Sequence, residues 1–305
     1  MSKTALLFPG QGAQSVGMGH SFAEGSPAAK ALFDRAAEVL GYDLAALCFE
    51  GPIETLTLSH HAQPGIFVTS VAGYTVLKER HPAFSFALAA GLSSGEWTAL
   101  HLAGVVSFED TLRILDRRGR FMQKACEQTP GGMVSVLGAS PELLQKVCNE
   151  TGAELANLNS HEQTVLSGPV AAIDQAEALA VELGAKRAIR LNVSGAFHST
   201  LMKPAADQLA DFLAGIPFQT PTFPVLSNVT GIPHAPDGEA IKAAMVAQIY
   251  SSVRWVQGME WMKAEGVDRY VECGPGKVLA GLLKRIDKQA VVHILSDLSG
   301  VEAIG

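Results

Sequence analysis

Short apolar runs alternate along the chain with longer segments in which apolar residues recur every three or four positions. The short runs at residues 4–8 and 84–90 predict buried strands. The longer segments at 28–40, 66–78 and 108–126 predict helices. Strands that alternate with helices from the first residues onward indicate an α/β core with a mostly parallel sheet.

The units become shorter after Pro130. Strands are predicted at 133–137, 155–159, 164–167 and 187–191, and helices at 141–150 and 170–183. Their order, βαββαβ, is the ferredoxin-like pattern. We therefore expect a large, hydrolase-like α/β domain formed by residues 1–127 and 196–305, and an inserted ferredoxin-like subdomain at 128–195. The junction between two such parts is a common place for a ligand site.

After the predicted subdomain, the chain again alternates between predicted helices and strands. We expect a helix ending at 213, a strand at 225–227, helices at 239–249 and 256–265, and a strand at 268–273. A last amphipathic helix follows Gly274-Pro275-Gly276-Lys277. This stretch is no phosphate-binding P-loop, because Val278 stands where that motif needs serine or threonine. The glycines after the first strand form no dinucleotide fingerprint, because Ser15 stands at the third glycine position.

Composition excludes several classes of protein. The 305 residues are 48% hydrophobic and 17% charged, which indicates a globular chain. A net charge of -7 gives no support for a nucleic-acid partner. The four cysteines include no Cys-x-x-Cys pair, which suits buried thiols in a reducing compartment. No apolar run is long enough for a membrane span or a signal-peptide core, so we expect a cytoplasmic protein. No exposed apolar stripe stands out in the sequence, so we expect a monomer.

A candidate nucleophile lies between the predicted strand at 84–90 and the helix that follows. The sequence Gly91-Leu92-Ser93-Ser94-Gly95 has the Gly-x-Ser-x-Gly spacing of a nucleophile elbow, whose glycines leave room for a sharp turn. The pattern alone is weak, and an ordinary Gly/Ser turn fits it equally well.

The base that such a serine needs is less evident. Of the nine histidines, His60, His61, His81 and His234 lie in polar stretches and are predicted to be solvated. His198 differs, because it lies where the chain leaves the inserted subdomain. An α/β-hydrolase would place an acid between serine and histidine, and the histidine near the chain end. Here 107 residues follow His198, which counts against an ordinary esterase.

Arg118 is the remaining candidate. An arginine on a long helix is usually solvated or half of an ion pair. If its side chain points into the cleft instead, its planar fork suits a substrate carboxylate.

Taken together, these stretches resemble the malonyl-CoA:acyl carrier protein transacylase family, the acyltransferases of fatty-acid and polyketide synthesis. The resemblance covers nearly the whole chain, in the family's order. Its stretches are Phe8-Pro9-Gly10-Gln11-Gly12-Ala13-Gln14, Gly91 to Glu96, Arg118-Gly119-Arg120-Phe121-Met122, Asn159-Ser160 with Gln163, Ala196-Phe197-His198-Ser199 with the residues up to Ala205, and Val271 to Leu279.

The resemblance implies transfer of a malonyl group from malonyl-CoA to the phosphopantetheine thiol of acyl carrier protein, by a ping-pong mechanism. Ser93 would be the nucleophile and His198 the general base, oriented by a main-chain carbonyl from the segment 251–254. The N–H groups of Gln11 and Ser94 would form the oxyanion hole, and Arg118 would bind the malonyl carboxylate. No metal and no bound cofactor are implied.

Two positions depart from the family pattern. The family usually has histidine before the nucleophile and a bulky apolar residue after it, where this chain has Leu92 and Ser94. Both alter the wall of the acyl pocket. The acidic carrier protein would need a basic patch on this chain, and two clusters are candidates: Lys186, Arg187 and Arg190, or Lys277, Lys284 and Arg285.

Two other functions remain open from the sequence. A thioesterase or serine hydrolase would use the same nucleophile, would not require Arg118 in the cleft, and would release free malonate. A carrier-protein-binding scaffold with a decayed site is suggested by Leu92, whereas the retained Ser93, His198 and Arg118 argue against it.

Overall fold

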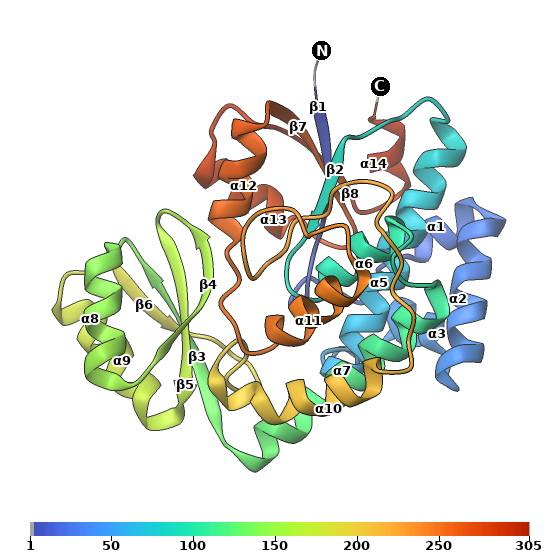
Figure 1. The fold of residues 1–305 in the computed structure, drawn as a ribbon. Coiled ribbons are helices and arrows are strands. Elements are labelled where there is room, and N and C mark those ends of the chain that lie inside the picture. The colour runs from blue at the N-terminus through green and yellow to red at the C-terminus, as the bar shows by residue number, and fades with distance from the viewer. Residues whose placement is uncertain (1–2, 305) are drawn as a thin grey trace.

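The computed structural model describes residues 3–304, and its strands form two separate four-stranded sheets in that range (Figure 1). The first sheet has the order β2-β1-β7-β8, and all of its neighbouring strands are parallel. Its strands are β1 (Lys3–Phe8), β2 (Leu88–Gly91), β7 (Val267–Cys273) and β8 (Val291–Leu295). The carboxyl ends of β1 and β2 therefore lie side by side, since Phe8 is paired with Gly91.

Both faces of this sheet are covered by helices, which explains why β1 is apolar at successive positions. Leu6 and Phe8 belong to the core on one face, and Ala5 and Leu7 belong to the core on the other. The first face is covered by α5 (Ser59–Arg80), α6 (Ser94–Leu102) and α7 (Phe108–Gln128), and the second by α12 (Trp255–Ala264) and α13 (Val278–Ile286). The other helices of the larger core are α1 (His20–Gly25), α2 (Pro27–Leu40), α3 (Leu44–Glu50), α4 (Ile53–Leu56), α10 (Lys203–Leu213), α11 (Gly238–Gln248) and α14 (Leu298–Glu302).

The second sheet forms the lobe drawn in green at the left of Figure 1. It is antiparallel with the order β4-β5-β3-β6, and α8 and α9 pack against it around a core of their own. Its elements in chain order are β3 (Gly131–Leu137), α8 (Pro141–Thr151), β4 (Glu154–Ser160), β5 (Gln163–Pro169), α9 (Val170–Glu182) and β6 (Arg187–Arg190). This βαββαβ unit, inserted into an α/β core, confirms the predicted fold class.

The prediction is wrong at several element boundaries. The strand expected at 84–90 covers only 88–91, because the preceding residues form a loop whose Phe86 packs edge-on against Phe223. The segment at 225–227 is no strand of a sheet but makes isolated bridges to Ala89 and Pro233. The helix α13 is not the last element, since β8 and α14 follow it.

The helix predicted to begin after Pro64 begins five residues before it. Proline lacks the N–H that would bond to the carbonyl of His60, four residues earlier. The Tyr42 hydroxyl approaches that carbonyl oxygen at 3.5 Å, so the carbonyl has another donor near it. A proline in this place therefore does not end the helix.

Within residues 3–304, no helix combines the length and the apolar composition needed to cross a membrane. The same residues contain no group of three or more His, Cys, Asp or Glu side chains that could hold a metal ion.

Candidate active site

A cavity of about 420 Å³ lies between the two sheets, at the carboxyl ends of β1 and β2. Gln11, Ser93, Arg118 and His198 line it from the larger part of the chain. The opposite wall comes from β4, β5 and the segment after β6, and includes Asn157, Asn159, Gln163, Leu191, Asn192 and Val193. The cavity thus brings together four of the five residues singled out in the sequence, while Ser94, the residue after Ser93, is buried and is not among its lining residues.

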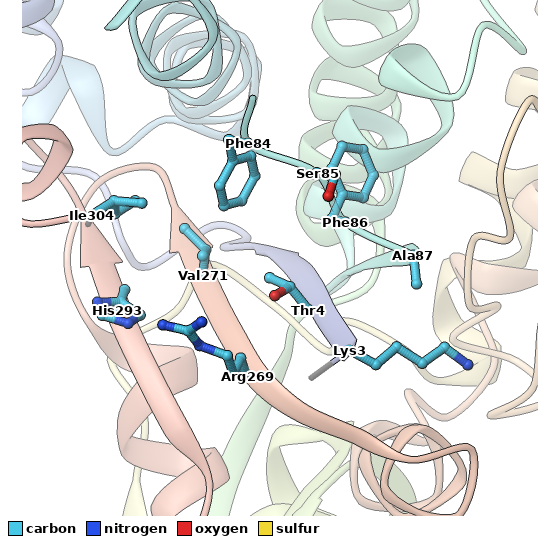
Figure 2. A pocket seen from close by; sticks show the side chains of 10 residues that line it. All are labelled: Lys3, Thr4, Phe84, Ser85, Phe86, Ala87, Arg269, Val271, His293 and Ile304. Atoms are coloured by element: carbon cyan, nitrogen blue, oxygen red, sulfur yellow. The ribbon is translucent and has the colours of Figure 1, made fainter. Parts of the chain in front are cut away.

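A second cavity of about 390 Å³ lies at the opposite end of the parallel sheet, where β1 and β7 begin (Figure 2). Thr4, Phe84, Arg269 and His293 are among its lining residues. Ligands of open parallel sheets bind at the carboxyl ends of the strands. The first cavity is therefore the candidate active site.

Ser93 lies on a strained turn between β2 and α6. Its φ is 53° and its ψ is -110°, a conformation that L-residues rarely adopt. The turn requires glycine on both sides: a Cβ on Gly91 would lie 1.9 Å from the carbonyl carbon of Gly95, and one on Gly95 would lie 2.2 Å from the carbonyl oxygen of Phe8. The glycine spacing in the sequence is thus explained by close backbone contacts.

His198 lies beside this serine. Its Nε2 is 2.9 Å from Ser93 Oγ, and its Nδ1 is 2.9 Å from the carbonyl oxygen of Gln248. The expected carbonyl segment, 251–254, begins three residues further on, and the Ser251 carbonyl makes an additional contact with the ring. Burial, and secondly the charge of Arg118, lower the pKa of His198 to about 4. The imidazole is therefore neutral at pH 7 and able to accept a proton.

Arg118 points into the site from α7 and is only 1% exposed. Its Nη1 donates to Gln63 Oε1 at 2.8 Å, and its Nη2 lies 3.1 Å from Gln248 Oε1 and 3.2 Å from Ser93 Oγ. Burial lowers the pKa of Arg118 to about 10, so the guanidinium is still charged at pH 7. A buried cation that binds only neutral groups is suited to receive an anion.

The loop after β1 approaches the elbow closely. A Cβ on Gly10 would lie 2.2 Å from the carbonyl oxygen of Leu92, so only glycine fits there. The N–H of Gln11 donates to the Ser94 hydroxyl at 3.2 Å. Ser94 begins α6, where backbone N–H groups have no acceptor within the helix. The two N–H groups expected at an oxyanion hole are therefore neighbours, and one of them bonds to the Ser94 side chain.

Further residues of the site were missed by the sequence analysis. The Asn228 side chain donates to the Gly91 carbonyl at 2.7 Å and accepts the Ser93 N–H at 2.6 Å, which holds both sides of the elbow. Gln248 supplies the carbonyl for His198, and its side chain donates to the Ser93 carbonyl at 2.9 Å. Glutamine and asparagine in helices and loops give no signal in a single sequence.

One histidine prediction is wrong. His234 was expected to be solvated, yet its side chain is only 3% exposed and its Nε2 lies 2.6 Å from Glu96 Oε1. Glu96 itself is fully buried on α6, one turn beyond Ser93. A polar loop sequence did not reveal this burial, because the contact joins residues 138 positions apart.

A serine on a strained turn, a neutral histidine on its hydroxyl and a buried arginine beside both are suited to acyl transfer. The chain is an acyltransferase: the family model described as acyl transferase domain matches residues 5–296. The malonyl CoA-acyl carrier protein transacylase of Bacillus subtilis (strain 168) is 43% identical over 99% of this chain and 96% of its own length.

Solved structures agree with this assignment. An acyl carrier protein S-malonyltransferase from Vibrio cholerae O1 biovar eltor has a TM-score of 0.95 and 40% identity, with 100% of both chains covered. A malonyl-transacylase solved in complex with a type II PKS acyl-carrier protein has a TM-score of 0.94 and 39% identity, over 99% of this chain and 98% of that one. This chain belongs to the family of malonyl CoA-acyl carrier protein transacylases.

Proposed function

We propose that this chain transfers malonyl groups from malonyl-CoA to the phosphopantetheine thiol of acyl carrier protein, in fatty-acid biosynthesis and in the cytoplasm. The observation that carries the proposal is the position of Arg118, whose Nη2 lies 3.2 Å from Ser93 Oγ. The carboxylate of a malonyl group is only two bonds from the thioester carbonyl. A cation that recognises it must therefore lie within a few ångströms of the attacking oxygen.

The first half-reaction acylates Ser93. His198 Nε2 takes the hydroxyl proton while Oγ attacks the thioester carbon. The N–H groups of Gln11 and Ser94 stabilise the oxyanion, each on the order of 10²–10³ in rate. When the tetrahedral intermediate collapses, the C–S bond breaks and His198 returns the proton to the sulfur of CoA.

The second half-reaction reverses these steps with another thiol. CoA leaves, the phosphopantetheine thiol enters, and His198 takes its proton as the sulfur attacks the malonyl ester. The ester bond to Ser93 breaks, and the proton returns to Ser93 Oγ. The thioester supplies the activation, so the mechanism uses no bound cofactor and no metal.

Arg118 selects the acyl group in this proposal. A malonyl carboxylate would accept hydrogen bonds from both ends of the buried Arg118 guanidinium. An acetyl group would leave that charge unpaired, which costs about 1–3 kcal/mol or more.

The division of the chain into domains is a second part of the proposal, and it is supported by the cavity, which elements of both sheets line. We propose that residues 128–195 form the subdomain that closes one side of the cleft, with 1–127 and 196–305 carrying the reacting groups.

The second basic cluster is the better candidate for carrier-protein docking. In the first cluster, the charge of Arg190 is compensated by Asp174 and Glu177. In the second, Arg285 Nη1 donates to Gln163 Oε1 at 3.1 Å, and Gln163 lines the candidate active site. Arg285 thus lies beside the cavity that the phosphopantetheine arm must enter, and Lys277 directly precedes Val278, which lines it.

Intact mass spectrometry tests the proposal. After mixing with malonyl-CoA, the chain is expected to gain one malonyl group, and Ser93→Ala is expected to gain none. Adding phosphopantetheinylated carrier protein should move the group onto the carrier within the mixing time. Release of free malonate at a rate comparable to transfer would favour the hydrolase alternative. Absence of any adduct would leave the scaffold alternative.

A further inference from the structure

The carboxylate of Glu96 is a buried group to which the expected mechanism assigns no part. It is fully buried on α6, the helix that begins directly after Ser93. A buried carboxylate needs several donors to remain charged. It has three: His234 Nε2 at 2.6 Å from Oε1, Gln248 Nε2 at 2.6 Å from Oε2, and the N–H of Asn228 at 3.2 Å from Oε2.

Glu96 determines which way the Gln248 amide points. An ionised carboxylate only accepts hydrogen bonds, whereas an amide has one donor end and one acceptor end. The Gln248 NH₂ therefore faces Glu96 and also donates to the Ser93 carbonyl. Its Oε1 is left for Arg118 Nη2, at 3.1 Å. If the amide turned over, its NH₂ would face the guanidinium, and two donors would confront each other.

His234 is the donor on the other oxygen of the carboxylate. The two side chains are 3% and 1% exposed, so water does not replace the histidine easily. Without it, Glu96 Oε1 would have no donor among residues 3–304. The carboxylate would then be held through Oε2 alone, and a buried oxygen without a donor favours rotation of the carboxyl group away from its present position. Such a rotation would release the Gln248 amide from the direction in which its NH₂ faces Glu96.

We propose that His234 is a positioning residue for substrate recognition: through Glu96 it fixes the Gln248 amide, and so fixes Arg118 in the direction that receives the substrate carboxylate. The inference rests on the proposed function. The His198 ring is not affected in the same way, because its partner is the Gln248 main-chain carbonyl and not the amide. Loss of His234 should therefore weaken recognition of the acyl carboxylate and leave the reactivity of Ser93 in place.

Two variants separate the hydrogen bond from the packing. His234→Met keeps a similar volume without a donor, and His234→Gln restores an N–H donor near the place of Nε2. For His234→Met, we expect KM for malonyl-CoA to rise about tenfold, the size of one hydrogen bond to a charged group, with kcat within a factor of two. His234→Gln should recover most of this loss.

A carboxylate-free probe measures Ser93 by itself. The rate at which a small fluorophosphonate labels Ser93 should be the same in wild type and His234→Met. His81→Met is the matched control, since within residues 3–304 the one hydrogen bond of His81 Nε2 is with the Val301 carbonyl on α14. It should lower Tm to a similar degree without changing KM for malonyl-CoA.

Three results would overturn the inference: an unchanged KM in a folded His234→Met, an equal loss of malonyl transfer and fluorophosphonate labelling, or no rescue by His234→Gln. Each of these leaves the proposed function intact, because wild type would still transfer malonyl. Wild type that labels with fluorophosphonate but forms no malonyl adduct would overturn the proposed function instead.

Discussion

Two cavities of similar volume lie at opposite ends of the parallel sheet, and they differ in how their polar side chains are connected. At the carboxyl ends, Arg118 and His198 are buried and each is held by hydrogen bonds from other elements. At the amino ends, Arg269 is exposed and lines the cavity (Figure 2), and its side chain makes no hydrogen bond to another of residues 3–304. Burying a charged group is costly unless hydrogen bonds or ion pairs compensate it, so buried charged groups that line a cleft point to a functional site. Connected buried polar groups, and not volume, therefore distinguish the candidate active site.

The largest expected difference between the two cavities comes from removing a serine hydroxyl in each of them. Ser93→Ala removes the proposed nucleophile and should lower malonyl transfer by at least about 10⁴-fold. Ser85→Ala, in the cavity at the amino ends, should leave transfer unchanged. Initial rates of malonyl-carrier formation measure both. A comparable loss in both variants would remove the distinction between the two cavities.

The arginines offer the second contrast. Arg118→Ala should lower kcat/KM for malonyl-CoA by about 10²-fold, because a charge-assisted interaction with the substrate carboxylate is lost. It should also raise the relative use of acetyl-CoA. Arg269→Ala is the control and should change neither value. An unchanged preference for malonyl over acetyl in Arg118→Ala would contradict the role given to Arg118.

The pH dependence of acylation tests the buried state of His198. Its pKa is lowered to about 4, mainly by burial, and the neutral ring is the form that accepts a proton. Acylation measured by rapid quench should therefore be constant from pH 7 to about pH 5, and should fall as the pH decreases through about 4. An inflection near pH 6.5, the ordinary value, would mean that water reaches the ring.

Ser94→Ala is expected to give the smallest effect. The Gln11 N–H donates to the Ser94 hydroxyl in the structure, so an oxyanion must compete with that hydroxyl. Removing the hydroxyl should raise the acylation rate about threefold, which corresponds to a fraction of the free energy of one neutral hydrogen bond. Single-turnover acylation measures this directly. A slower variant would indicate that the hydroxyl holds the Gln11 loop in place.

Much of the fold could be predicted because it follows from local patterns. The apolar run of β1 and the shorter units after Pro130 indicated the two sheets and their order. Errors occurred where tertiary contacts override those patterns: the loop before β2 is apolar because Phe84 and Phe86 pack, and Pro64 lies inside a helix.

The residues of the site also divide into those that a local pattern predicts and those that it does not. The spacing of Gly91, Ser93 and Gly95 follows from a local turn, so it could be recognised in the sequence. His198 and Arg118 were ambiguous from the residues alone and gained meaning only through the family resemblance. Glu96 meets Asn228, His234 and Gln248 across 130 positions or more, and no local pattern joins it to them.

The separation of these groups along the chain also affects when the site can form during synthesis and folding. Ser93 and His198 are 105 residues apart, and the carbonyl that orients His198 lies 50 residues further on. Because chains are synthesised from the amino end, Ser93 leaves the ribosome well before the groups that activate it in the proposed mechanism. A partly synthesised or partly folded chain would thus contain the proposed nucleophile without its base. Under that mechanism, such a chain would not consume malonyl-CoA until both parts have folded against each other.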